Sequence, residues 1–116
     1  MSNITRKSAA EIAEMRRAGA IVAEVLARVE EAARPGASTA ELDALAEQLI
    51  RTAGAASNFK GYHGFPATIC ISIDAEVVHG IPGDREIKEG SLVSVDAGAI
   101  WEGWHADAAQ IGRAHV

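Results

Sequence analysis

Two aspartates, Asp96 and Asp107, lie in apolar segments typical of the two arms of a β-hairpin, in the stretch VDAGAIWEGWHADAAQ. A carboxylate is costly to bury unless a proton, a cation or hydrogen-bond donors compensate its charge. If residues 100–103 form a four-residue loop, Asp96 lies directly opposite Asp107 on one sheet face, with Cβ atoms roughly 4.5–5.5 Å apart. A three-residue loop would place the two side chains on opposite faces instead.

Two carboxylates at that distance repel each other, and a divalent cation between them would remove the repulsion. Oxygen ligands of this kind suit hard or borderline metal ions, and carboxylates can bridge two metal ions about 3.5–4 Å apart in hydrolytic sites. The spacing alone leaves two alternatives open. The aspartates could be solvated on an exposed face, or they could form an acid pair that shares one proton.

The elements that must position these aspartates are two helices followed by strands. Residues 8–11 (SAAE) and 38–41 (STAE) have the spacing of capping boxes, and Gly54 stands where a C-terminal glycine cap belongs. The first helix should end at residues 34–36. The apolar residues expected to face inward are Ile12, Met15, Gly19, Val22, Leu26 and Val29 in the first helix and Leu42, Leu45, Leu49 and Ile50 in the second.

The rest of the chain has β character. After a glycine-rich loop at residues 54–66, the runs TICISI and EVVHGIP indicate strands that are interrupted at residues 74–75. The hairpin then consists of SLVSVDAGA and WHADAA, with Gly103 supplying a positive φ in its turn. These elements predict an α+β fold in which two helices pack on an antiparallel sheet.

The composition narrows the functional class. A chain of 116 residues fits one domain, and its net charge of −5 provides no basic surface for DNA or other nucleic acid. The single cysteine cannot form an internal disulfide, and no apolar run is long enough for a signal core or a membrane span. We therefore expect a cytoplasmic protein that acts on neither DNA nor membranes.

Several segments together resemble the N-terminal half of the type I methionine aminopeptidases. They are EIAEMRRAG, PGASTAELD, FKGYHGFPATICIS, VVHGIP and VSVDAG followed by HADAA, and they occur in the family's order over residues 7 to about 109. The combination of GYHGFP, VVHGIP and the two aspartates is specific, whereas each segment alone would be weak. The resemblance implies the N-terminal half of the pita-bread fold of the creatinase and aminopeptidase enzymes.

The resemblance also implies an activity, which is removal of the initiator methionine from nascent proteins by metal-activated water. It assigns Asp96 as a chelator of one metal ion and Asp107 as a bridge between two divalent ions, whether cobalt, iron, manganese or zinc. It places the catalytic His79 beside the scissile bond, hydrogen-bonded to the substrate amide. Read without the family, His79 could simply hold the turn at residues 80–82.

Further residues are expected to contact the substrate. By the resemblance, Phe59, Tyr62, Phe65 and Cys70 line the pocket for the methionine side chain, and a soft apolar pocket suits a thioether. Read alone, aromatics in such a loop are more often packing residues. His63 is expected to lie on the substrate side or just behind it. His105 should share the face of Asp107, but the family does not use this position as a ligand.

The chain also departs from the family pattern. The family's other metal ligands, one histidine and two glutamates, lie in a second half that is related by pseudo-twofold symmetry. We therefore expect residues 1–110 to be the N-terminal half of a catalytic domain and a fragment that is inactive alone. Residues 111–116 (IGRAHV) do not follow the family, and one reverse translation of them resembles a sequencing adapter, so we expect them to be non-native.

The expected partners are the N-termini of nascent polypeptides at the ribosome, and the full-length protein is expected to be a monomer. Two alternatives belong to other functional classes. One is an Xaa-Pro dipeptidase or creatine hydrolase of the same fold, against which the pocket segment GYHGFP argues. The other is a noncatalytic binding relative, which would be expected to lose the two aspartates.

Overall fold

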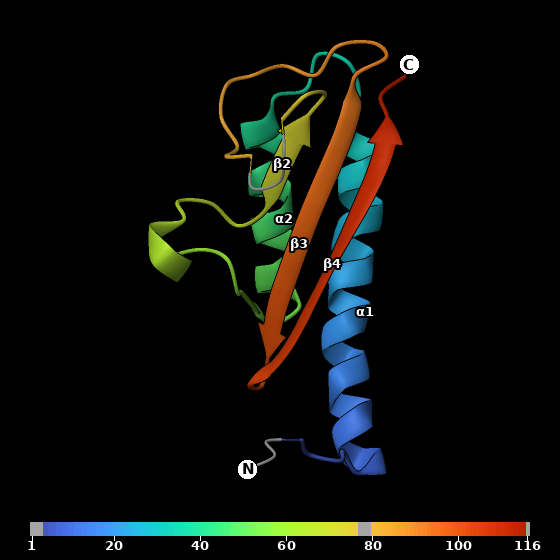
Figure 1. The fold of residues 1–116 in the computed structure, drawn as a ribbon, viewed down its shortest axis with the longest axis vertical. Coiled ribbons are helices and arrows are strands. Elements are labelled where there is room, and N and C mark those ends of the chain that lie inside the picture. The colour runs from blue at the N-terminus through green and yellow to red at the C-terminus, as the bar shows by residue number, and fades with distance from the viewer. Residues whose placement is uncertain (1–3, 77–79, 116) are drawn as a thin grey trace.

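Two helices cover one face of a four-stranded antiparallel sheet (Figure 1). The computed structural model describes residues 4–76 and 80–115. The elements are α1 (Ala9–Ala32), α2 (Thr39–Thr52), β1 (Ala56–Ser57), the short 3₁₀ helix η1 (Tyr62–Gly64), β2 (Cys70–Ile73), β3 (Leu92–Trp101) and β4 (Trp104–Arg113). This α+β architecture is the one that the sequence predicts. No helix in the described ranges is long and apolar enough to cross a membrane.

Both helices begin at the predicted caps. The Ser8 hydroxyl accepts from the backbone N–H of Glu11, whose carboxylate accepts from the backbone N–H of Ser8. At the start of α2, the Ser38 hydroxyl accepts from the backbone N–H of Glu41. These bonds satisfy donors that the first helical turn leaves unpaired.

The inward stripe of α1 is predicted correctly only in its second half. Val22, Leu26 and Val29 are buried, but Ile12 and Met15 are 42% and 40% exposed. The N-terminal turns of α1 extend past the end of the hairpin, so that no strand covers them (Figure 1). Helical periodicity identifies the apolar face of a helix but not how far the sheet beside it reaches.

β3 is the central strand of the sheet. β4 pairs with β3 along its full length, and β1 and β2 pair with different parts of β3. Because a strand has two edges, β1 and β2 share the edge opposite β4. The odd-numbered residues of β3 from Val93 to Ala99 are buried and face the helices, whereas Asp96 and the other even-numbered residues face the opposite side. We call that opposite side the open face.

The hairpin turn is tighter than expected. Trp101 pairs with Trp104, which leaves a loop of only Glu102 and Gly103, both with positive φ (48° and 82°). Such a two-residue turn matches the right-handed twist of the flanking strands. The guanidinium of Arg17 lies 5.4 Å from the ring centroid of Trp101, which holds this end of the hairpin against α1. The predicted positive φ at Gly103 is confirmed, and the predicted four-residue loop is wrong.

The predicted strand at residues 76–82 is also wrong where it can be checked. Val77 to His79 lie outside the described residues, and residues 80–82 form no strand. Gly80 instead packs its backbone against β2, where its carbonyl accepts from Ile71 N–H (3.0 Å) and its N–H donates to the Ser72 hydroxyl (3.2 Å). At the opposite edge of the sheet, β4 continues through Arg113 and so includes part of the segment IGRAHV.

Candidate metal centre and substrate pocket

Asp96 and Asp107 lie on the same face of the hairpin. Asp107 pairs with Gly98, and Asp96 is two residues from Gly98 along β3, so both aspartate side chains are on the open face. The prediction of a shared face is therefore confirmed, but that of direct opposition is wrong. The tighter turn shifts the pairing of β3 with β4 by two residues. Because side chains alternate between the faces with a period of two, this even shift keeps both aspartates on the same sheet face. It makes them diagonal neighbours and not directly opposed residues.

The two carboxyl groups interact strongly. Burial, the hydrogen bond with Asp107 and the negative charge of Asp107, in that order, raise the pKa of Asp96 to about 7. The Oδ1 atom of Asp96 is buried and has no hydrogen-bond partner among the described residues. A buried oxygen without a donor, beside a second carboxylate, is a site that a divalent cation fits.

The rest of the metal-ligand set is not supplied by the described residues. Among residues 4–76 and 80–115, no group of three or more His, Cys, Asp or Glu side chains could hold a metal ion. The open face therefore contributes two carboxylates, and a tight site would need further ligands.

The raised pKa of Asp96 predicts a pH-dependent cost to folding in the metal-free protein. The folded pKa of about 7 exceeds the ordinary value of 3.8, so the folded state binds this proton more tightly than the unfolded state. Stability is then greatest at low pH and falls as the pH rises from about 4 through 7. Asp96→Asn should remove this fall, because an amide stays neutral and can still donate to Asp107.

Thermal melting of the metal-free full-length protein from pH 4 to 8 measures this cost. We expect Asp96→Asn to melt a few degrees above wild type at pH 8 and at the same temperature as wild type at pH 4. The difference at pH 8 is limited to a few degrees because water screens part of the charge on a half-buried carboxyl group. Asp84→Asn, at an exposed position, is the control and should follow wild type. A constant difference across the pH range would contradict the coupling of the two aspartates.

An apolar cavity of about 670 Å³ opens beside the aspartates. Its lining residues are Asn58, Phe59, Tyr62, His63, Gly64, Phe65, Pro66, Cys70, Ile81 and His105. The rings of Phe59 and Phe65 meet edge to face with centroids 6.5 Å apart, and those of Tyr62 and His63 do so at 4.2 Å. The cavity thus brings together all the predicted substrate-contacting residues except His79, which lies outside the described part of the chain.

Cys70 connects this cavity to the aspartates. It lines the cavity and is also the β2 residue that pairs with Asp96 across the sheet. Burial, and then the negative charges of Asp96, Asp107 and Asp43, raise the pKa of its thiol to about 11. Cys70 is therefore a neutral part of the cavity wall and a poor nucleophile.

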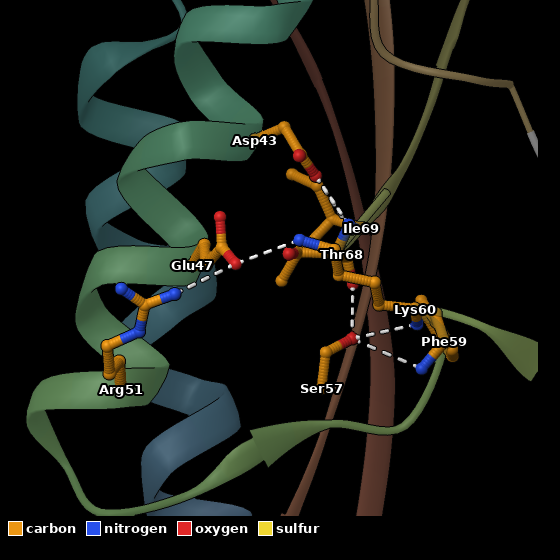
Figure 2. A network of polar contacts seen from close by, with 8 residues as sticks. All are labelled: Asp43, Glu47, Arg51, Ser57, Phe59, Lys60, Thr68 and Ile69. Atoms are coloured by element: carbon orange, nitrogen blue, oxygen red, sulfur yellow. Dashed lines mark hydrogen bonds and ion pairs between the residues drawn. The ribbon is translucent and has the colours of Figure 1, made fainter. Parts of the chain in front are cut away.

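We call residues 58–69 the cavity loop. Polar side chains of α2 and β1 fix both ends of this loop (Figure 2). One carboxylate oxygen of Asp43 accepts from the backbone N–H groups of Thr68 and Ile69, both at 2.9 Å. The Ser57 hydroxyl donates to the Thr68 carbonyl and accepts from the N–H groups of residues 59 and 60. α2 and β1 therefore determine where Cys70 and the aromatic residues stand.

Removing the Asp43 carboxylate should destabilise this loop. Asp43→Ala would leave the N–H groups of Thr68 and Ile69 without acceptors, and both residues are at most 1% exposed. Each unpaired buried donor costs about 1–3 kcal/mol, so we expect the two donors together to lower the unfolding free energy by about 2–6 kcal/mol. Urea denaturation measures it, with Gln48→Ala on the exposed side of α2 as the control. A loss below about 0.5 kcal/mol would show that Asp43 does not anchor the loop.

Five cavity residues are absent from the predicted set. Gly64 and Pro66 belong to the segment GYHGFP, and His105 is recognisable by its alternation with Asp107. Asn58 and Ile81 give no local signal. Asn58 reaches the cavity because it follows β1 along the β3 edge, and Ile81 because the backbone at Gly80 packs on β2. Both placements depend on contacts between segments that are distant in sequence.

Comparison with known proteins places this geometry in a family. Residues 13–112 match the model of metallopeptidase family M24. Over 107 residues the chain is 50% identical to methionine aminopeptidase 1 of Mycobacterium tuberculosis, an alignment that covers 91% of this chain and 40% of that protein. The chain thus spans less than half the length of this curated relative.

Solved structures agree with the sequence match. The crystal structure of methionine aminopeptidase from Rickettsia prowazekii superposes with a TM-score of 0.93 at 32% identity, covering 97% of this chain and 46% of that one. Prolidase from Pyrococcus furiosus superposes with a TM-score of 0.74 over 91% of this chain and 32% of its own, and at 20% identity it shows the fold alone. The predicted likeness to part of the pita-bread fold is confirmed, and the chain belongs to metallopeptidase family M24.

Proposed function

We propose that this chain forms part of a metal-dependent methionine aminopeptidase, which removes the initiator methionine from nascent proteins. One observation carries the proposal. The apolar cavity and the aspartate pair adjoin on the open face, because Cys70 lines the cavity and pairs with Asp96. A peptide whose first side chain enters the cavity would therefore present its first peptide bond near the two carboxylates.

In this proposal, Asp96 and Asp107 hold two divalent metal ions, chosen from cobalt, iron, manganese and zinc. When bound, such ions supply a Lewis acid for the scissile carbonyl and an activated water. The orphan Oδ1 of Asp96 supports its role as a ligand. The diagonal placement of Asp107 supports a carboxylate that is shared between two ions.

The chain's own residues would bind and orient the substrate. Phe59, Phe65 and the neutral Cys70 provide an apolar surface for a thioether, and Tyr62 is 67% exposed at the mouth of the cavity. For His79, the resemblance alone supports a hydrogen bond to the substrate amide. His63 adjoins Tyr62 and would contact the substrate from the rim.

The wider assignments are also proposals. The chain supplies two of the five side-chain ligands that the resemblance implies, so activity would require the remaining length of the relatives. We propose a cytoplasmic monomer that acts on nascent N-termini at the ribosome, with no DNA or membrane partner. An Xaa-Pro dipeptidase of the same fold is the second candidate function, and a noncatalytic binding relative is the third.

The test compares these candidates on the full-length product of the source gene. With Mn²⁺ or Co²⁺ added, we expect release of methionine from the peptide Met-Ala-Ser, no cleavage of the dipeptide Met-Pro, and loss of activity with a chelator. Cleavage of Met-Pro but not of Met-Ala-Ser would favour the dipeptidase. No cleavage of either peptide, together with no bound metal, would favour the binding relative.

A further inference from the structure

The side chain of Asn58 crosses the central strand on the open face. β1 pairs Ser57 with Ala99, so Asn58 follows on next to Gly98. The Asn58 Nδ2 group donates to the carbonyl oxygen of Ala106 on β4, at 3.4 Å. The carboxamide therefore runs from the cavity loop, over β3, to the strand that carries Asp107.

Gly98 makes this crossing possible. A Cβ atom at position 98 would lie 2.1 Å from the Asn58 Oδ1 atom, which is far inside van der Waals contact. Gly98 has no positive φ and lies in the middle of a strand, where glycine is otherwise unfavourable. The absent side chain is thus explained by the carboxamide that occupies its place.

The carboxamide lies next to both aspartates. Asp107 pairs directly with Gly98, and Asp96 is the neighbouring open-face residue of β3. Residues so placed have Cβ atoms roughly 4.5–5.5 Å apart across the strands and about 7 Å apart along one strand. Asn58 also lines the cavity, so its amide stands on the border between the cavity and the aspartate pair.

The hydrogen bonding of Asn58 is unfavourable for stability. Its one described hydrogen bond is long, and its Oδ1 atom is buried with no partner among the described residues. A buried carbonyl oxygen without a donor is destabilising, so its presence needs an explanation other than stability. The position of the amide beside Asp107 offers one.

We propose that Asn58 is a positioning residue for the aspartate pair. Its carboxamide ties the β4 backbone at Ala106 to the cavity loop and so fixes Asp107 relative to Asp96. Gly98 is the matching residue that leaves room for it. The proposal rests on the proposed function, because it takes the two aspartates as the metal ligands. Groups that orient metal ligands typically account for about 10–100-fold in metal affinity or activity.

The test uses the full-length protein with Asn58→Ala, Gly98→Ala and the double variant. Calorimetric titration of the metal-free proteins with Mn²⁺ should show about 10-fold weaker binding in Asn58→Ala. Gly98→Ala should weaken binding equally, because the new methyl group displaces the flexible carboxamide. The double variant should be no weaker than either single variant, since both changes break the same contact. The melting temperature of metal-free Asn58→Ala should stay within about 2 °C of wild type.

Kinetics provide the second readout. For Met-Ala-Ser we expect kcat to fall with Mn²⁺ affinity while KM changes less than about twofold, because the cavity that holds the first side chain is retained. A lower melting temperature with unchanged Mn²⁺ affinity would overturn the proposal and leave Asn58 a purely structural residue. Additive losses in the double variant would also overturn it.

The Mn²⁺ titrations test the role of Asn58 separately from the proposed function. If wild type binds Mn²⁺ but releases no methionine, the proposed function fails while the Mn²⁺ titrations still decide the role of Asn58. If wild type binds no Mn²⁺, both fail.

Discussion

Asp107→Asn should abolish metal-dependent methionine release by the full-length protein, with kcat/KM falling by more than about 100-fold. Groups that only orient metal ligands already account for about 10–100-fold, and Asp107 is proposed to contact both ions itself. An amide keeps the shape of the side chain but lacks the charge that holds divalent cations. Asp96→Asn should have a similar effect, because Asp96 is the diagonal neighbour of Asp107 on the same sheet face and its Oδ1 atom has no hydrogen-bond partner among the described residues.

Metal binding and stability show whether the loss arises at the site. Calorimetric titration with Mn²⁺ should show weaker binding in both variants, while their metal-free forms remain folded. Asp84→Asn removes an exposed carboxylate from the loop between β2 and β3 and should keep both activity and Mn²⁺ affinity. If either Asp96→Asn or Asp107→Asn retains wild-type kcat/KM, that aspartate is not a metal ligand.

Much of the fold can be predicted from local pattern. Capping residues and apolar spacing locate both helices, and strand alternation places Asp96 and Asp107 on one face. This shared face is predicted correctly although the predicted loop is too long, because the actual turn is shorter by two residues and an even shift keeps each side chain on its face. The wrong loop length does change the predicted contact between the two aspartates, which are diagonal neighbours and not directly opposed.

The features that could not be predicted depend on contacts between distant segments. Exposure of Ile12 and Met15 depends on where the sheet ends beside α1 (Figure 1). The role of Asp43 depends on a loop that returns to α2 about 25 residues later in the chain. The pairing of Asn58 with Gly98 requires the register of β1 on β3, which a strand of two residues does not reveal.

Replacing Gly80 by alanine should strongly destabilise the fold, because the Gly80 backbone lies so close to β2 that no side chain fits between them. A Cβ atom there would lie 1.9 Å from the Ile71 carbonyl oxygen and 2.7 Å from its carbonyl carbon. These are backbone atoms of a buried strand, so they cannot move aside as a flexible side chain could. The Gly80 backbone also bonds to both Ile71 and Ser72, and a shift would strain or break those hydrogen bonds.

We therefore expect Gly80→Ala to lower the unfolding free energy of the full-length protein by about 3 kcal/mol or more. In a domain of 150–250 residues this corresponds to a fall of roughly 6–12 °C in melting temperature. Gly83→Ala is the matched control, since nothing lies within 4 Å of its added methyl group and its φ is not positive. The control should melt at or slightly above the wild-type temperature, because alanine restricts the unfolded chain more than glycine does. Equal melting temperatures for the two variants would mean that residue 80 does not pack against Ile71, and the placement of Ile81 at the cavity would then lose its structural basis.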